Sequence, residues 1–449
     1  MHYSSFHGKS TGMAASDLAA KFDFALQHHR AGRLPKARQA YRKVLKAAPG
    51  HADALHMLGL LEHQAGDNAA AIKLFNRAVA AGPASAELYT NLGSALQASG
   101  KADAAIAAFR QAIGINPGFA LAHNNLGNAL RVTGGMDAAL DAFRQAISIA
   151  PDFALAHYNL GDLLHAHGQH DEAIAAMKRA LTLEPNFPDA CNSLATMLME
   201  QEGMDEARAL FERTLQLDNK NTSARHMLSA LEGHTTKSAP AGYVVGLFDG
   251  CASYFDQHLV EELGYQVPQS LHKAVSQLLG PEQQELDVMD LGCGTGLCGP
   301  LFRGMAGTMV GVDLSPGMLT KASQRKLYDR LVTADIIKEL RVCEDAYDLI
   351  LAADVFIYVG GLDQVFEAIG MALRSGGLFA FSIEAKEGDG NFVLRPTGRY
   401  AHSIGYLIRL AEAVGLQEVY LEESVLRMDK GQPVAGYIVV LGKPGECGL

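Results

Sequence analysis

The stretch Leu286-Asp-Val-Met-Asp-Leu-Gly-Cys-Gly-Thr-Gly296 determines how the second half of the chain folds. Its first six residues have the apolar composition of a buried strand and run directly into glycines at positions 292, 294 and 296. Glycine has no Cβ, so a ligand can approach the backbone of this turn closely, and a helical pattern follows. We therefore expect a ligand-binding turn between a strand and a helix.

Strand-like and helix-like segments alternate from this turn onward. The alternation predicts a doubly wound, mostly parallel sheet with helices on its faces. Such a sheet binds ligands at the carboxyl ends of its strands, where Asp290 and Asp313 stand. Helices are expected after Gly296 and near residues 316–327, 361–373 and 402–414, and strands at residues 286–291, 308–313, 331–335, 347–352, 378–384, 418–424 and 435–442.

An acidic residue before a GxGxG turn, with another acidic residue ending the next strand, resembles the first two motifs of the Rossmann-like, class I S-adenosylmethionine-dependent methyltransferases. The resemblance implies S-adenosyl-L-methionine as the cofactor. It further implies that Asp335 contacts the adenine and that Asp354 lines the methyl-transfer end. The implied cofactor-binding residues are Asp290, Gly292, Gly294, Gly296, Asp313, Asp335 and Asp354.

Two alternatives compete with these assignments. Gly294, Gly296 and Gly299 also spell the GxGxxG of nicotinamide-dinucleotide sites, but Asp290 would repel a pyrophosphate there, which favours the methyltransferase interpretation. Asp335 and Asp354 are also suited to capping the helices that follow them.

The same resemblance places the methyl acceptor near the fifth strand and the last helix. Tyr358 and His402 are the catalytic candidates, but the sequence does not identify either of them as a general base. Arg399 and Tyr400 are the substrate-binding candidates. Glu384 and Arg395 belong to the same region, and Tyr254 and Asp256 resemble a lid element over the cofactor. Six cysteines without a CxxC pair or histidines at zinc spacing indicate no metal site and no disulfide framework.

The first half of the chain repeats every 34 residues. Prolines recur at positions 49, 83, 117, 151 and 185, and a Leu-Gly pair recurs at 58–59, 92–93, 126–127 and 160–161. An aromatic column follows at Phe75, Phe109 and Phe143. Each period therefore predicts two helices that cross closely at the glycine and end before the proline.

These columns resemble the tetratricopeptide repeat family, in six repeats over about residues 18–220. The resemblance implies an all-α solenoid that binds a protein or peptide in its groove. The predicted organisation is a flexible N-terminus (1–17), repeats with a capping helix (18–233), a linker (234–241) and a methyltransferase domain (242–449).

Asn91, Asn125 and Asn159 form another column with the 34-residue spacing. An asparagine amide both donates and accepts hydrogen bonds, so a ladder of these side chains can bind an extended peptide backbone. The alternative is that they bond only to water or to neighbouring helices.

Composition excludes several classes of protein. Residues 236–449 carry a net charge of −10, which disfavours nucleic acid as a partner. No apolar run approaches the roughly 20 residues of a membrane-spanning helix, and residues 1–18 lack the apolar core of a signal peptide. We expect a cytoplasmic protein.

The combined prediction is a methyltransferase that modifies a protein or peptide recruited by its repeats. A small-molecule methyltransferase that uses its repeats for assembly is one alternative. A cofactor-binding scaffold without turnover is another, which the intact motif at Asp290 to Asp313 disfavours.

Overall fold

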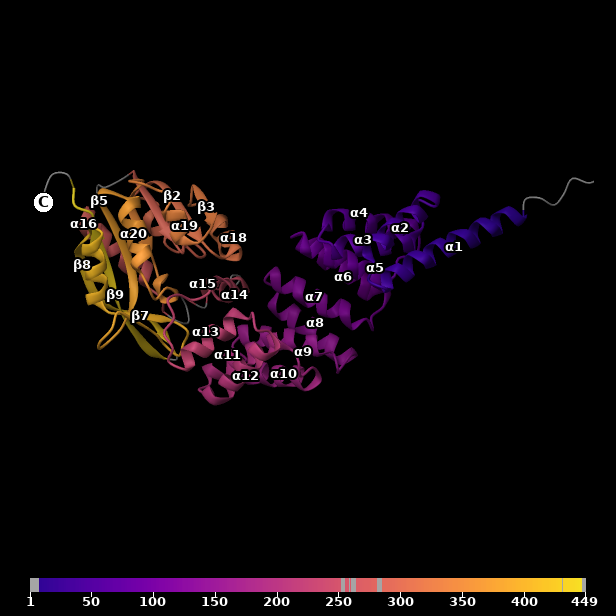
Figure 1. Cartoon of the computed structure of the whole chain (residues 1–449), viewed down its shortest axis with the longest axis horizontal. Coiled ribbons are helices and arrows are strands. Elements are labelled where there is room, and N and C mark those ends of the chain that lie inside the picture. The colour runs from indigo at the N-terminus through magenta and orange to yellow at the C-terminus, as the bar shows by residue number, and fades with distance from the viewer. Residues whose placement is uncertain are drawn as a thin grey trace, which may run out of the picture. The chain divides into compact units, whose positions relative to one another are not determined.

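The computed structural model describes residues 8–251, 255–257, 259, 264–280, 285–429 and 431–445 (Figure 1). The chain divides into two compact units between Pro185 and Asn186. Within the described ranges, no helix combines the length and the hydrophobicity that crossing a bilayer requires.

The first unit consists of paired antiparallel helices, as the 34-residue period predicts. Its helices are α1 (Gly8–Arg30), α2 (Leu34–Ala47), α3 (Ala52–Gln64), α4 (Asn68–Ala81), α5 (Ala86–Ala98), α6 (Ala102–Ile115), α7 (Ala120–Val132), α8 (Met136–Ile149), α9 (Ala154–Ala166) and α10 (His170–Leu183).

Glycine allows the two helices of a repeat to cross closely. A Cβ on Gly93 in α5 would lie 2.5 Å from the ring of Phe109 in α6, and a Cβ on Gly127 would lie 2.6 Å from the ring of Phe143. Both rings are fully buried. The glycine column and the aromatic column therefore meet at Gly59, Gly93 and Gly127. The predicted helical solenoid is confirmed.

The second unit begins with α11 (Pro188–Glu200), α12 (Met204–Leu217) and α13 (Thr222–Leu231) and continues through α14 (Ala241–Cys251), α15 (Phe255–Gln257) and α16 (Val267–Leu279). The later helices are α17 (Gly299–Phe302), α18 (Pro316–Arg325), α19 (Ile336–Leu340), the 3₁₀ helix η2 (Phe356–Tyr358), α20 (Asp363–Ala372) and α21 (Ile404–Ala413). The strands are β1 (Leu286–Leu291), β2 (Ala306–Asp313), β3 (Arg330–Thr333), β4 (Tyr347–Ala352), β5 (Leu373–Ala385), β6 (Phe392–Leu394), β7 (Tyr400–His402), β8 (Gln417–Asp429) and β9 (Gln432–Gly442).

These strands form one mostly parallel sheet in the order β3-β2-β1-β4-β5-β7-β6, which confirms the predicted fold class. Strands β1 to β5 pair in parallel. Strand β9 pairs antiparallel with β5 and with β8, so the two strands expected at residues 418–424 and 435–442 form an antiparallel end to the sheet.

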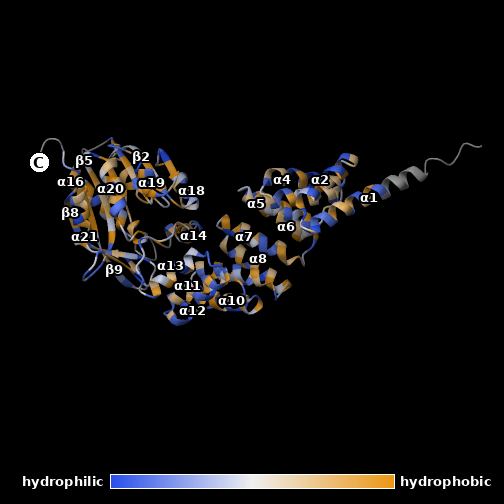
Figure 2. Ribbon diagram, viewed as in Figure 1, coloured by the Kyte–Doolittle hydropathy of each residue, from blue (hydrophilic) through white to orange (hydrophobic). Residues whose placement is uncertain are grey.

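Helices cover both faces of the sheet. Alternate strand residues such as Met289 and Phe379 pack against α20 and α21, while Val288 and Leu349 pack against α16 and α17. Figure 2 shows hydrophobic residues, in orange, running through the sheet. Burial on both faces explains why the strands read as nearly continuous apolar runs in the sequence.

The short β6–β7 hairpin was not predicted. Strand β7 runs parallel to the end of β5 and antiparallel to β6, and the helix expected from residue 402 begins at Ile404. Each of these strands has only three residues, too few for an alternating apolar pattern to stand out.

The predicted linker lies in an extended path beside this hairpin. The backbone N–H of Ala239 donates to the Tyr358 carbonyl oxygen at 2.9 Å, and that of Gly361 donates to the Lys237 carbonyl oxygen at 2.8 Å. Ala230 of α13 shares a buried cluster with Leu394 and Tyr400 of the hairpin. Helix α13 and residues 235–239 therefore pack against the same part of the sheet domain.

Candidate active site

Acidic residues stand at the carboxyl ends of five neighbouring strands. In the spatial order β3, β2, β1, β4, β5 they are Asp335, Asp313, Asp290, Asp354 and Glu384. The carboxyl ends of parallel strands share one edge of a sheet, so the acidic residues predicted to bind the cofactor are brought to one edge.

The glycine turn adopts a backbone that other residues rarely adopt. The φ angles are +59° at Gly292, +54° at Gly294 and +84° at Gly296. A Cβ on Gly292 would lie 2.6 Å from the Val355 side chain, whereas a Cβ on Gly294 would meet nothing within 4 Å. The turn is therefore left-handed at all three glycines and open beside Gly294.

The Asp313 carboxylate connects the glycine turn to the turn after β2. Its Oδ2 accepts from the N–H of Gly294 at 2.9 Å, and its Oδ1 accepts from the N–H of Ser315 at 2.8 Å. Burial raises the pKa of Asp313, and the two amide hydrogen bonds oppose that rise. The side chain thus fixes the relative positions of the glycine turn and the turn after β2.

Asp290 is a buried acid with one unfilled acceptor. Its side chain is 1% exposed; Oδ2 accepts from the Tyr328 hydroxyl at 2.6 Å, and Oδ1 is buried without a hydrogen-bond partner. Burial raises the pKa of Asp290 to about 7; the Tyr328 hydroxyl and the Cys298 thiol oppose this rise, and the nearby Asp313 charge adds to it. An unpaired buried acceptor beside an open glycine turn fits a ligand that brings a donor or a positive charge.

Asp290→Asn is expected to stabilise the ligand-free protein at alkaline pH. The pKa of Asp290 is raised from 3.8, so the folded state binds this proton more tightly than the unfolded state does. The resulting stability is present below pH 4 and is lost as the pH rises through 7. The free-energy advantage of the variant should therefore grow from pH 5 to pH 8, by on the order of 3 kcal/mol, when thermal unfolding is followed by calorimetry.

Asp287→Asn is the matched control in the same strand. The Thr308 hydroxyl and Arg374 lower the pKa of Asp287, so this residue is ionised in both states across that pH range. Its effect on unfolding should not change between pH 5 and pH 8. If the effect of Asp290→Asn on the free energy of unfolding were also independent of pH, that result would contradict the burial of Asp290.

The lid-like segment contacts both the glycine turn and the turn after β2. Asp256 accepts hydrogen bonds from the Thr295 hydroxyl and from Arg325. Asp249 in α14 accepts from the Ser315 hydroxyl and, at 3.1 Å, from the N–H of Gly317. Tyr254 lies outside the described residues. Two carboxylates therefore hold α14 and α15 against the glycine turn and the turn after β2.

Asp335 and Asp354 differ in what they contact. Asp335 caps α19, because its Oδ1 accepts from the N–H groups of Ile337 and Lys338, both at 3.1 Å. Asp354 has a φ of +56° and bonds to the Ser382 hydroxyl at 2.9 Å. Its carboxylate also pairs with Arg427 at 2.7 Å. The capping alternative therefore describes Asp335 and not Asp354.

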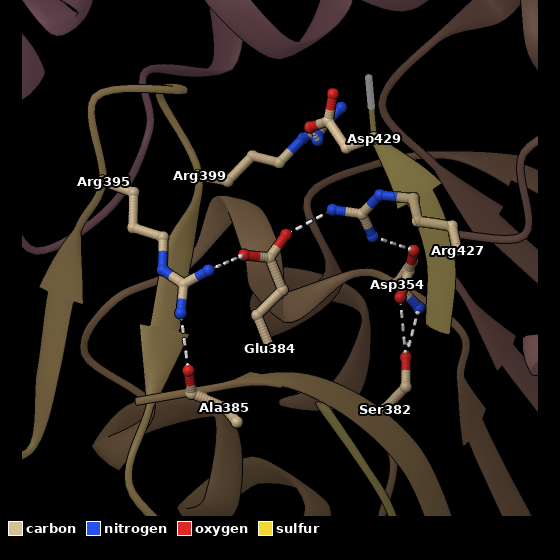
Figure 3. A network of polar contacts seen from close by, with 8 residues as sticks. All are labelled: Asp354, Ser382, Glu384, Ala385, Arg395, Arg399, Arg427 and Asp429. Atoms are coloured by element: carbon tan, nitrogen blue, oxygen red, sulfur yellow. Dashed lines mark hydrogen bonds and ion pairs between the residues drawn. The ribbon is translucent and has the colours of Figure 1, made fainter. Parts of the chain in front are cut away.

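A buried ionic network lies at the ends of β4, β5 and β8 (Figure 3). The Arg427 guanidinium bridges Asp354 and Glu384, and Arg427 and Glu384 are each 3% exposed as side chains. On the far side of Glu384, Arg395 approaches Oε2 at 3.3 Å and donates to the Ala385 carbonyl oxygen at 2.6 Å. Nearby, Arg399 pairs with Asp429 at 3.1 Å.

The acceptor candidates are placed differently from one another. His402 is fully buried, and its Nε2 lies 2.9 Å from the Val359 carbonyl oxygen and 3.0 Å from that of Gly360. Burial lowers the pKa of His402 to about 4, so the ring is neutral at pH 7 and its Nε2–H donates to these carbonyls. Tyr400 is also fully buried and bonds to Thr236.

Tyr358 and Arg399 lie partly exposed beside α14. Burial raises the pKa of Tyr358, and the neighbouring Arg399 charge opposes that rise. Tyr358 also meets Phe248 of α14 edge to face, with the ring centroids 5.4 Å apart. Of the four acceptor candidates, only these two have partly exposed side chains.

The turn of the β6–β7 hairpin packs on α13 and α14 through Gly398. The Gly398 carbonyl oxygen lies 2.9 Å from His226 Nε2, and φ is +77°. A Cβ at this position would lie 2.7 Å from the Met227 sulfur and 2.9 Å from the Tyr243 hydroxyl. The residue next to Arg399 is therefore held by the last helix before the linker.

Gly398→Ala is expected to lower the free energy of unfolding by about 1–3 kcal/mol, because it adds both backbone strain and a clash. Gly388→Ala is the control: its φ is +71°, but its Cβ would meet nothing within 4 Å, so only the strain remains. Calorimetry of both variants separates the two effects. Equal losses of stability would show that the contact with α13 is loose.

The asparagine column joins successive repeats in the first unit. Asn91 bonds to His56 Nε2 at 2.8 Å, and Asn159 donates to Asn124 at 2.8 Å. Asn125 approaches the Ser94 hydroxyl at 3.5 Å. Each partner lies in the first helix of the preceding repeat. These contacts agree with the alternative interpretation, in which the asparagines bond to neighbouring helices. Peptide binding by this column remains a prediction.

Two residues of the site, Tyr328 and Arg427, were not predicted from the sequence. Arg427 lies in a strand where the pairing with β9 shifts between Val425 and Arg427. Leu426 and Arg427 are both buried as a result, at 1% and 3% exposed. Strict alternation would turn only one of two consecutive residues inward, so the sequence offered no signal for this arginine.

Comparisons with known proteins agree with this architecture. A family model described as a methyltransferase domain matches residues 288–377. Models described as tetratricopeptide repeats match residues 22–86, 90–154, 134–190 and 164–231.

Similar curated proteins match over short stretches. The chain is 36% identical over 64 residues to an 18S rRNA (guanine-N(7))-methyltransferase of Bos taurus, covering 14% of this chain and 23% of that protein. It is 28% identical over 102 residues to a malonyl-[acyl-carrier protein] O-methyltransferase of Acetivibrio thermocellus, covering 22% and 36%. The chain thus spans about a quarter to a third of the length of these relatives.

Among solved structures, the protein MamA is 34% identical, with 36% of this chain and 94% of that chain covered and a TM-score of 0.34. The repeat columns, the sheet order and the two kinds of family match lead to one assignment. The chain carries tetratricopeptide repeats followed by a methyltransferase domain of the class I, S-adenosylmethionine-dependent type.

Proposed function

We propose that this protein transfers a methyl group from S-adenosylmethionine to a protein or peptide recruited by its repeats. The observation that carries the proposal is the open glycine turn between Asp290 and Asp313, with the Oδ1 of Asp290 buried and unpaired. A cationic ligand that also has hydroxyl groups matches this pair of carboxylates.

The residues that would hold the cofactor follow from their positions. Gly292, Gly294 and Gly296 would let it approach the backbone, Asp313 would accept from ribose hydroxyls, and Asp290 would face its positive end. Asp335 and Asp354 would flank these contacts from the ends of β3 and β4.

When bound, S-adenosylmethionine supplies a sulfonium methyl that is already electrophilic. The residues of this chain then need only hold the acceptor in line, exclude water and, for some acceptors, take up a proton. Tyr358 and Arg399 would orient the acceptor, and α14 and α15 would exclude water. His402 would act indirectly, because its Nε2 contacts the Val359 and Gly360 carbonyls and so supports the backbone after Tyr358.

The test is transfer of label from methyl-labelled S-adenosylmethionine in a lysate of cells that lack the protein. The full chain should label a discrete protein band, and Asp313→Ala should abolish that label. Label found only in small molecules would instead identify a small-molecule methyltransferase. Cofactor binding without any transfer would identify a scaffold.

Recruitment is tested by removing the repeats, and the position of the cut is decisive. A cut after residue 233 would remove α13, which packs on the hairpin that carries Arg399. A chain that starts at Asn186 keeps this contact. It should still bind S-adenosylmethionine yet lose labelling of the protein band. Undiminished labelling would refute recruitment by the first unit.

A further inference from the structure

A groove of about 880 Å³ lies between α1 and α2 in the first repeat. Its walls include Phe24 and His28 from α1 and Ala40 from α2. The opposite sides of the two helices form the repeat core through Ala25, Tyr41 and Val44, which are fully buried. The groove is therefore a second, outward face of the same helix pair.

The apolar wall of this groove is exposed to solvent, whereas the equivalent positions of the later repeats are buried. Phe24 is 55% exposed, whereas Leu58 and Leu92, which follow it at 34-residue intervals, are 4% and 6% exposed. Leu58 is covered by packing against the helix pair of the preceding repeat. Phe24 belongs to the first repeat, so this groove is the place where the second helix of a preceding repeat would pack.

A buried polar atom in the groove also lacks a partner. The His28 ring meets Phe24 edge to face, with the ring centroids 4.5 Å apart, and its Nδ1 is buried without a hydrogen bond. A buried ring nitrogen without a partner is uncommon in a completed interface. The groove thus has an exposed apolar surface formed by Phe24, beside a histidine whose Nδ1 is buried without a partner.

The rim of the groove is basic. Lys36, Lys43 and Lys46 line it from α2, all three are exposed, and none forms an ion pair with another described residue. One repeat later, Lys36 and Lys46 are replaced by Ala70 and Ala80, so these charges are a feature of the first repeat. Lysines around an apolar surface are complementary to an acidic amphipathic segment.

We propose that the α1–α2 groove binds an acidic amphipathic helix of a partner protein, seated as the second helix of a preceding repeat would be. The apolar face of that helix covers Phe24, and its acidic flanks pair with Lys36, Lys43 and Lys46. A nucleic-acid backbone would satisfy the lysines but would leave Phe24 exposed. This interaction goes beyond the proposed methyl transfer and does not depend on turnover.

The experiment uses the full chain and a fluorescent synthetic peptide of about 18 residues, with Leu at helical spacing and Glu at most other positions. Lys43→Glu/Lys46→Glu should weaken binding by about tenfold or more. Phe24→Ser should weaken it by a similar factor without unfolding the repeat, since this ring is already exposed. Lys73→Glu/Lys101→Glu makes the same charge change elsewhere in the repeats and should leave the affinity within about twofold.

A peptide of the same composition in scrambled order has no apolar face. It distinguishes binding of an amphipathic helix from binding that depends on negative charge alone. Equal binding of the two peptides would overturn the proposal. An equal loss of peptide affinity in Lys43→Glu/Lys46→Glu and in Lys73→Glu/Lys101→Glu would also overturn it. Self-association of the chain that disappears in Phe24→Ser would assign the groove to a second copy instead. Methyl transfer is not measured, so these outcomes are independent of the proposed enzyme activity.

Discussion

Arg427→Met is expected to lower the free energy of unfolding of the second unit by about 3–5 kcal/mol. The guanidinium lies between the Asp354 and Glu384 carboxylates, and it is only 3% exposed. Its removal leaves two carboxylates close together without their shared cation, and Glu384 is as deeply buried as the arginine. Calorimetry of the full chain measures this loss. The unfolding transition of the second unit is identified as the one that is also seen in a chain that starts at Asn186.

Arg395→Met is the matched control, because Arg395 bonds to the same Glu384 carboxylate from a side chain that is 38% exposed. Solvent screens that pair, so its loss should cost less than about 1 kcal/mol. Adding Glu384→Gln to Arg427→Met should recover part of the lost stability, because one of the stranded charges is removed. Equal costs for the two arginine variants would contradict a buried network.

The second large effect is expected for Asp313→Ala, which should weaken binding of S-adenosylmethionine by about a hundredfold or more. The variant loses the acceptor for the Gly294 and Ser315 amides and the carboxylate proposed to face the ribose. Hydrogen bonds to a charged group contribute about 1.5–3 kcal/mol each, so the loss of the two bonds proposed between the carboxylate and the ribose hydroxyls gives this factor. Titration calorimetry measures it directly.

Asp329→Ala controls for a general loss of structure. Asp329 also accepts from a backbone amide, that of Met309 at 2.7 Å, but it precedes β3 and so lies at the opposite edge of the sheet. This variant should bind the cofactor with nearly normal affinity. Comparable weakening in both variants would show that Asp313 acts only by supporting the fold.

Local and periodic features of this molecule were predictable from its sequence. The limits of β1 and β4, the left-handed glycine turn and the close crossing of Gly93 with Phe109 all depend on residues near one another or on a repeated period. Such patterns are visible in the chain itself. The acidic residues at the strand ends followed from the same alternation of strands and helices.

Features that depend on distant pairing were not predictable. Strands β6 and β7 are recognisable only through their pairing with each other and with the end of β5. Arg427 reaches Glu384 because an irregularity in the β8–β9 pairing turns two consecutive residues inward. Tyr400 and His402 are buried because they lie in this hairpin. Since the hairpin was not predicted, the sequence could not distinguish the buried acceptor candidates from the partly exposed ones.

The packing of α13 on the β6–β7 hairpin also limits how this architecture can be recombined. A chimera that exchanges one repeat array for another at the predicted linker would separate Gly398 from His226 and Met227. An exchange at Pro185 leaves these contacts whole. The unit that can be moved between proteins is therefore the sheet domain together with its last three array helices, so new specificities are best grafted upstream of them.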